Sequence, residues 1–168
     1  MGDIINTDFF RYNIVEYAYT FLNKKYIWGA KGPHEFDEGS LVWYIYKALF
    51  DIDIIKDGYG SDDTSKILTS SIGKLTSFLE NDDKKSKYIE SIALGDIVFF
   101  HTKSLNDNNV SSANKYPGDA GIYIGSKSFI HASYDKGIIC IETLSDKWLD
   151  RLVGTKDIID YIGKKLSN

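Results

Sequence analysis

The sequence has one cysteine, Cys140, among 168 residues, which excludes an internal disulfide and a cysteine-rich zinc site. It also lacks any apolar run near the roughly 18 residues that a membrane-spanning helix needs. The first residues carry neither the basic segment nor the apolar stretch of a secretory signal peptide. We therefore expect synthesis in the cytoplasm without a signal peptide, so that work outside the cell would require another carrier.

A surplus of basic charge is absent as well. Lys and Arg together number 20 against 24 Asp and Glu, which gives a net charge of −4 and a pI near 5.3. Binding to nucleic acid is excluded on this ground, because a basic face is needed to neutralise phosphates. Hydrophobic residues make up 43% of the chain and aromatic residues 14%, enough for a packed core. The length predicts a single domain over 1–168.

The first half of the chain shows helical periodicity and turn residues. Apolar side chains recur at helical spacing after Asp8, and the segment that starts at Gly39 is apolar on almost every side, as expected of a buried central helix. The pattern predicts a helix over 8–23 capped by Asp8, a loop over 26–38, the central helix over 39–50, a short helix over 63–70 capped by Asp62 or Asp63, and a charged loop over 81–87.

The second half is typical of strands. Short apolar or alternating runs occupy 96–101, 121–124, 128–131 and 138–143, separated by Gly, Ser and Asp. The last three runs are so closely spaced that an antiparallel meander is expected. Residues 103–118 are polar and form a long loop of the kind that often borders a functional site. Helices followed by strands predict an α+β fold.

Four segments, in chain order, resemble the motifs of the NlpC/P60 family. Its usual motifs are Y-x-W-G-G with F-D-C-S-G-L-V, then P-G-D-L-V-F-F, H-V-G-I-Y-I-G and F-I-H-A. The corresponding segments here are YIWGA at 26–30 with FDEGSLV at 36–42, LGDIVFF at 94–100, DAGIYIG at 119–125 and FIHA at 129–132. Residues 148–153 are similar to the closing segment of the family.

The resemblance implies a papain-like α+β fold, with N-terminal helices packed on an antiparallel sheet. The family consists of cysteine peptidases that cut peptidoglycan stem peptides, typically next to γ-D-glutamate. In its chemistry a Cys at a helix N-terminus is the nucleophile, because the helix dipole favours the thiolate. A His on a neighbouring strand serves as base and acid, and a third polar group orients that His.

Carried over residue by residue, the motifs place Glu38 at the nucleophile position, Asp119 at the base position and His131 at the orienting position. The Ser-Gly pair that follows the nucleophile is inverted here, as Gly39-Ser40. A carboxylate is a poor nucleophile toward amides, and Asp119 cannot replace an imidazole. The resemblance therefore implies that the thiol mechanism of the family is not available to this chain.

The resemblance also implies a set of substrate-binding residues along the cleft: Tyr26, Trp28, Asp37, Ser40 and Tyr123. A structural alternative exists for three of them. Trp28 and Tyr123 could serve packing alone, and Asp37 could cap the central helix.

Other side chains that could replace the thiol are weaker candidates. Cys140 lies in an apolar run beyond the motifs, where a buried small residue is the simpler interpretation. Ser40 is two positions from Glu38 and so points to another helix face. We expect His34 to be an exposed loop histidine and His101 to meet solvent at the end of a strand.

Two functional hypotheses follow. The first is a catalytically degenerate member of the family that keeps the cleft as a binding or structural module, without cofactor or metal. The alternative is an active cell-wall hydrolase, of the γ-D-glutamyl endopeptidase type, in which Glu38, Asp119 and His131 form an acid pair or hold a metal. In the first case one protonated imidazole between the two carboxylates would relieve their repulsion.

The expected partner is a peptidoglycan peptide. By analogy with the family, the domain could belong to the baseplate hub of a phage-tail-like particle, with tail or baseplate proteins as neighbours and delivery to the cell wall by the particle. A stand-alone cytoplasmic protein is the alternative.

Overall fold

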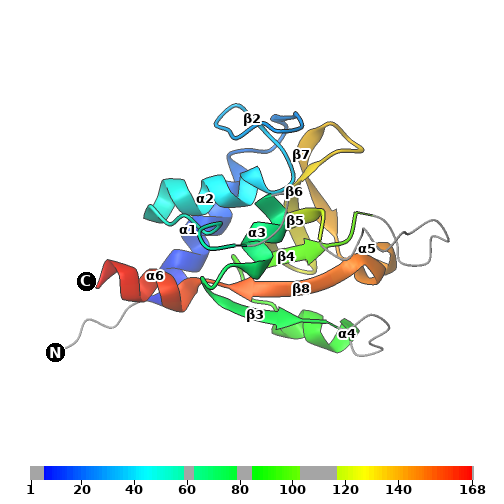
Figure 1. Ribbon diagram of the computed structural model, residues 1–168. Helices are drawn as coiled ribbons and strands as arrows, with labels where there is room; N and C mark the ends of the chain where they lie inside the picture. The colour runs from blue at the N-terminus through cyan, green and yellow to red at the C-terminus, as the bar shows by residue number, and fades with distance from the viewer. Residues whose placement is uncertain (1–5, 59–62, 79–84, 103–116, 168) are drawn as a thin grey trace.

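The computed structural model describes residues 6–58, 63–78, 85–102 and 117–167 (Figure 1). In chain order the elements are α1 (Thr7–Tyr19), β1 (Lys25–Tyr26), β2 (Glu35–Phe36), α2 (Ser40–Phe50), α3 (Asp63–Thr69), β3 (Lys74–Ser77), α4 (Lys85–Tyr88), the 3-10 turn η1 (Ile89–Ser91), β4 (Ile97–Phe100), β5 (Asp119–Gly125), β6 (Ser128–Ser133), β7 (Ile138–Thr143), α5 (Asp146–Arg151), β8 (Leu152–Asp157) and α6 (Ile159–Leu166).

The strands form one sheet in the order β2-β1-β7-β6-β5-β4-β8-β3. All neighbours are antiparallel except β1 and β2, which run parallel. The predicted meander is present as β5, β6 and β7, with Gly121 opposite His131 and His131 opposite Cys140. The α+β prediction is confirmed.

Each face of the sheet buries its own apolar cluster. Ile122 and Ile130 belong to one cluster, which also contains Leu41 and buried side chains of α1, α2 and α6. Phe129 and Phe100 point to the opposite face and contact Trp148 of α5 (ring centroids 5.0 and 4.8 Å). None of the helices in the described segments combines the length and apolarity that a membrane crossing requires.

The start of α2 is fixed by a reciprocal pair of hydrogen bonds. The Ser40 backbone N–H donates to Asp37 Oδ1 (2.8 Å), and the Asp37 N–H donates to Ser40 Oγ (2.9 Å). This pairing satisfies backbone donors at the helix end, where no helical partner exists. A side chain at Gly39 would lie 2.7 Å from the Thr64 backbone nitrogen, so the approach of α3 requires glycine there. The helix therefore begins two residues after Glu38, as the motif predicted.

Helix α1 and the loop after it differ from the prediction. Asn6, not Asp8, caps α1, because its Oδ1 accepts a hydrogen bond from the Phe9 N–H (3.2 Å), while Asp8 lies in the first turn. The helix ends at Tyr19 and not at Asn23. The segment 26–38, predicted to be a loop, contains β2 and the end of β1. A strand pair of two residues is too short to produce a recognisable alternation.

Besides β1 and β2, six elements of the described segments were not predicted: β3, α4, η1, α5, β8 and α6. Strand β8 has a polar sequence, yet Lys156 within it is buried because its Nζ donates to the carbonyls of Ile67 (2.6 Å) and Ser70 (2.7 Å). Helix α4 lies in the segment predicted to be a charged loop. The proposed cap Asp62, residues 81–84 and most of the predicted 103–118 loop lie outside the described residues.

Arg11 connects α1 to the neighbouring ends of β4 and β8. Its guanidinium donates to Asp96 Oδ1 (2.8 Å) and to Asp157 Oδ2 (2.6 Å). The Asp96 side chain is almost fully buried, and burial raises its pKa to about 6 although Arg11 opposes the shift. Above that pH the Asp96 carboxylate depends on Arg11 for its charge compensation.

We predict that Arg11→Ala lowers the free energy of unfolding by about 2 kcal/mol at pH 8, since it leaves a buried carboxylate without its partner. The loss is smaller at pH 5, where Asp96 is protonated. Urea denaturation at the two pH values measures the difference. Lys47→Ala, which removes an exposed ion pair with Asp51, is the control and should leave the midpoint unchanged. An equal loss at both pH values would contradict the assignment to Asp96.

Candidate functional site

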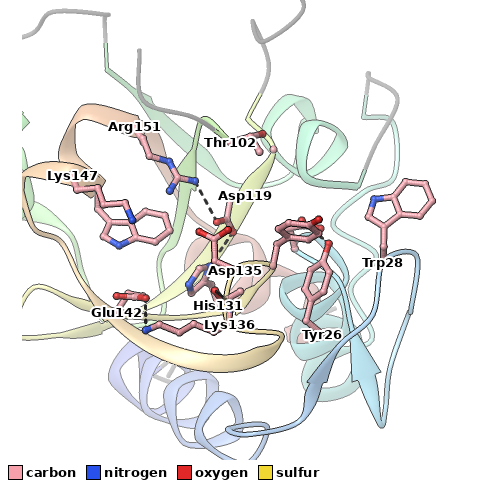
Figure 2. Close-up of a pocket in the computed structure, with 15 residues that line it drawn as sticks. Tyr26, Trp28, Thr102, Asp119, His131, Asp135, Lys136, Glu142, Lys147 and Arg151 are labelled. Atoms are coloured by element: carbon pink, nitrogen blue, oxygen red, sulfur yellow. Dashed lines mark hydrogen bonds and ion pairs between the residues drawn. The ribbon is translucent and has the colours of Figure 1, made fainter. Parts of the chain in front are cut away.

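A cavity of about 390 Å³ opens where the N-terminus of α2 meets the ends of β5, β6 and β7 (Figure 2). Aromatic and charged side chains dominate its wall. It is lined by Tyr26, Trp28, Glu38, Thr102, Gly118, Asp119, His131, Ser133, Tyr134, Asp135, Lys136, Glu142, Lys147, Trp148 and Arg151.

Glu38 occupies the wall near the start of α2 and is paired with a tyrosine. The Tyr26 hydroxyl donates to Glu38 Oε1 (2.7 Å). Burial raises the pKa of the Glu38 carboxyl, and the nearby Asp119 and Asp37 add to this shift, although the Tyr26 hydrogen bond opposes it. Burial and the Glu38 carboxylate together raise the pKa of the Tyr26 hydroxyl well above its usual value. At neutral pH Tyr26 is therefore a donor, and Glu38 is an acceptor that gains a proton more readily than an exposed glutamate.

Asp119 and His131 form a buried pair at the centre of the cavity. His131 Nδ1 lies 3.2 Å from Asp119 Oδ1, and the imidazole is 2% exposed. Burial alone would lower the His131 pKa, but the charge and hydrogen bond of Asp119, with a contribution from Cys140, raise it to about 9. The imidazole is therefore protonated at neutral pH, and Nδ1–H is the donor toward Asp119.

Arg151 is a second cation beside Asp119 and was missed in the sequence. Its Nη2 lies 3.7 Å from Asp119 Oδ2. The guanidinium is held in place by its Nε–H, which donates to the His101 carbonyl (2.7 Å), and by stacking 4.2 Å from the Trp148 ring centroid. The only available signal was the similarity of 148–153 to the closing segment of the family, which carried no residue roles.

The three residues at the family's catalytic positions all line this one cavity, yet they do not share a proton as one trio. His131 pairs with Asp119, whereas Glu38 accepts its hydrogen bond from Tyr26. The expectation of one imidazolium bonded to both carboxylates was therefore wrong. The repulsion between the carboxylates is reduced by separate partners, since Asp119 also faces Arg151.

The structure separates the expected substrate-binding residues into two groups. Tyr26 and Trp28 line the main cavity, and Asp37 lines a second cavity of about 570 Å³ that shares Trp28 and Glu38. Trp28 is 83% exposed, so its ring does not serve packing. Ser40 and Tyr123 are buried and border neither cavity; Ser40 holds the start of α2, and the Tyr123 hydroxyl accepts from the Lys127 N–H (3.2 Å).

Three of the weaker candidates for the role of the thiol differ in exposure: Cys140, His34 and His101. Cys140 is partly exposed, so the interpretation of it as a buried residue was wrong. It lies opposite His131 across the β6–β7 pair. His34 is exposed in its loop, as predicted. His101 is 6% exposed and not in solvent, because β4 ends under Arg151. Cys140 is absent from the residues that border the main cavity, so the geometry does not present its thiol to a ligand there.

A model of the NlpC/P60 family matches residues 23–157, and the chain therefore belongs to that family. A curated relative, "Probable peptidoglycan endopeptidase LytE" of Bacillus subtilis, is 29% identical over 143 residues, which cover 85% of this chain and 33% of the relative. The chain thus spans about a third of that relative's length.

Solved structures show the same fold. NlpC2 from Trichomonas vaginalis superposes with a TM-score of 0.61 at 24% identity, covering 86% of this chain and 44% of that one. The NlpC/p60 domain of peptidoglycan hydrolase SagA gives 0.58 at 20% identity, covering 88% and 97%. The predicted family and its papain-like fold are confirmed.

The Asp119–His131 pair predicts a pH-dependent stability. Because the folded His131 pKa of about 9 exceeds the ordinary value of 6.5, the pair's stabilisation is complete below pH 6.5 and is lost as the pH rises through 9. The contribution is on the order of 1–3 kcal/mol. In EDTA-containing buffer, the free energy of unfolding should fall across this window, as measured by denaturant titration at several pH values.

Asp119→Asn removes the charge that raises the His131 pKa, so the variant should show a flatter curve across the same window. His34→Gln, in an exposed loop, should retain the wild-type slope. A wild-type slope in Asp119→Asn would show that His131 is not stabilised by this carboxylate.

Proposed function

We propose that this domain binds a peptidoglycan stem peptide in its cavity without cutting it by the thiol mechanism. The observation that carries the proposal is the exchange at the start of α2. The motifs align Glu38 with the family's nucleophile, and this carboxylate accepts a hydrogen bond from Tyr26 at the wall of an open cavity. The names of the two relatives, a probable peptidoglycan endopeptidase and a peptidoglycan hydrolase, support the same ligand.

The charges of the cavity wall suit a ligand with both carboxylates and amines. Lys147 and Arg151 lie on one side, whereas Tyr26 and Trp28 lie on the opposite side (Figure 2). The cations can pair with peptide carboxylates, and the carboxylates around Glu38 can accept from an ammonium group. The exposed indole of Trp28 offers an apolar contact for the peptide backbone or an alkyl side chain.

Binding should depend on Trp28. A γ-D-glutamyl tripeptide that ends in a diamino acid is the probe, and Trp28→Ala should weaken its binding about tenfold, or ~1.4 kcal/mol, because the rim contact is lost. Isothermal titration calorimetry in EDTA measures the dissociation constants. Tyr12→Ala is the matched control, since Tyr12 is a 61% exposed aromatic residue on α1 that borders neither cavity. Equal affinities for both variants would contradict binding in this cavity.

The domain should release no product from muropeptides. Wild type, Glu38→Gln and Cys140→Ser are incubated with the same tripeptide and analysed by mass spectrometry, and all three should leave it intact. Cleavage that Cys140→Ser abolishes would mean that the thiol acts after all. Cleavage that Glu38→Gln abolishes would establish the second candidate function.

That second candidate is an active hydrolase that uses carboxylates. Burial raises the pKa of the Glu38 carboxyl, and this direction favours the second candidate, because a general acid must hold its proton more tightly than an exposed glutamate does. Asp119 beside His131 would then be the second carboxyl group of the site. The proposal of a binding module ranks first, because Asp119 pairs with His131 and faces Arg151, whereas Glu38 pairs with Tyr26, so the two carboxylates have separate partners.

Where the domain acts is a separate proposal that depends on family analogy alone. We propose that a phage-tail-like particle carries it to the cell wall as part of a baseplate hub. Co-purification with sheath and tube proteins in a particle preparation would support this, and an exclusively soluble, particle-free protein pool would contradict it.

A further inference from the structure

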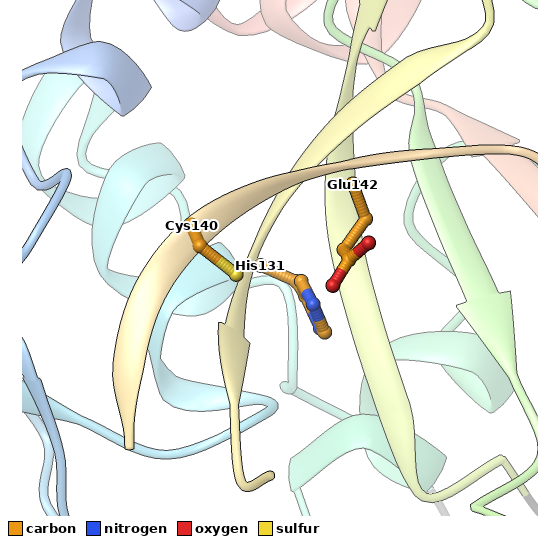
Figure 3. Close-up of side chains that lie close together, drawn as sticks. All are labelled: His131, Cys140 and Glu142. Carbon is orange, nitrogen blue, oxygen red and sulfur yellow. The ribbon is translucent and has the colours of Figure 1, made fainter. Parts of the chain in front are cut away.

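Three neighbouring side chains, two of which line the cavity, are not used by the proposed binding function: His131, Cys140 and Glu142. Cys140 and Glu142 lie two positions apart on β7, so both point to the same sheet face. That face also carries His131, which is the register partner of Cys140 on β6. Figure 3 shows the two β7 side chains directed toward the imidazole. One potential ligand atom from each residue lies within 4.8 Å of the others.

One ring nitrogen of His131, Nε2, is not engaged by Asp119. Its Nδ1 is engaged by Asp119, but no described residue forms a hydrogen bond with its buried Nε2, and the ring is only 2% exposed. A buried polar atom without a partner is costly and calls for an explanation, such as a bound ion. We propose that His131, Cys140 and Glu142 form a zinc-binding site beside the cavity.

The ligand set identifies the metal. Thiolate, imidazole and carboxylate together suit Zn²⁺, whereas Ca²⁺ and Mg²⁺ prefer oxygen ligands alone. Metal-binding histidines commonly donate their other ring N–H to a carboxylate, and Asp119 already accepts from Nδ1 of His131. The orientation of the ring is therefore fixed before any metal binds.

Zinc binding at this site requires the movement of two side chains, Glu142 and Lys136. Ligand atoms around tetrahedral zinc lie about 3.5 Å apart, so atoms that are now up to 4.8 Å apart must approach by roughly an ångström. Glu142 has flexible torsions that permit this movement. Glu142 Oε1 also pairs with Lys136 Nζ at 2.5 Å, but the Lys136 side chain is 49% exposed and can turn into solvent. Lys136 is therefore a competitor for the site and not a part of it.

Access comes from the cavity. His131 and Glu142 belong to its wall, so zinc held between them would be reachable from that side, whereas Cys140 lies behind. Three protein ligands leave a fourth coordination position for water or for a carboxylate of a bound molecule. Binding releases two protons, one from the Cys140 thiol and one from Nε2 of the His131 imidazolium, because thiolate and an unprotonated ring nitrogen are the ligands.

The test is a zinc titration of the EDTA-treated, dialysed protein at pH 7, without peptide. We expect one Zn²⁺ per chain by calorimetry, and substitution of Co²⁺ should give the near-ultraviolet charge-transfer band of a thiolate ligand. Cys140→Ser and Glu142→Gln should each weaken zinc binding at least about tenfold. Lys136→Gln should strengthen it, because the competing ammonium is removed. His34→Gln, which alters an exposed histidine, is the control and should bind as wild type.

Several results would overturn the site. One is zinc binding in Cys140→Ser equal to that of wild type, and another is a cobalt spectrum without the thiolate band. Unchanged affinity in both Glu142→Gln and Lys136→Gln would exclude the carboxylate. The cobalt spectrum of wild type decides the question even if a variant fails to fold. Because peptide binding is measured in EDTA and zinc binding without peptide, failure of either proposal leaves the other standing.

Discussion

The Asp119 carboxylate is the interaction on which the cavity depends. One oxygen faces the imidazole of His131 and the other the guanidinium of Arg151, so a single side chain connects β5, β6 and the end of α5. All three groups are largely buried, and two cations around one anion leave no uncompensated negative charge. Loss of the carboxylate would leave buried positive charges without their counter-ion, which costs more than the pair itself contributes.

The contacts show how the residues that the motifs align with the family's catalytic positions are accommodated. At the start of α2, the hydroxyl of Tyr26 supplies the donor that the Glu38 carboxylate needs. On β5, Asp119 acts as the acceptor for His131, which the motifs align with the orienting position. The imidazole is the cation of an ion pair here. The wall retains its shape because each new charge has a local partner.

The sequence allowed the scaffold of this site to be predicted, since the four motifs are local. They placed Glu38 near the start of the central helix, and they placed Asp119 and His131 on neighbouring strands. Three features could not be found in this way. Arg151 reaches Asp119 from 32 positions further along the chain, which only the packing of α5 against the sheet brings about. Lys156 is buried because its ammonium meets carbonyls at the end of α3, and its hydrophilic character concealed β8. Cys140 was interpreted from its apolar neighbours, but strand alternation directs it to the polar face, opposite His131.

Most of the side chains that hold the sheet and α2 together lie outside the cavity wall. The sheet carries the apolar clusters on both faces, and α2 is held by Asp37 and Ser40 and not by the residue at the nucleophile position. The stability of the fold therefore depends on side chains other than Glu38, so the residue at that position can differ without disturbing the fold. The cavity then persists as a set of fixed charges and aromatic surfaces. Such a wall can hold a ligand, and it can also acquire new chemistry where adjacent strands bring a thiol, an imidazole and a carboxylate together.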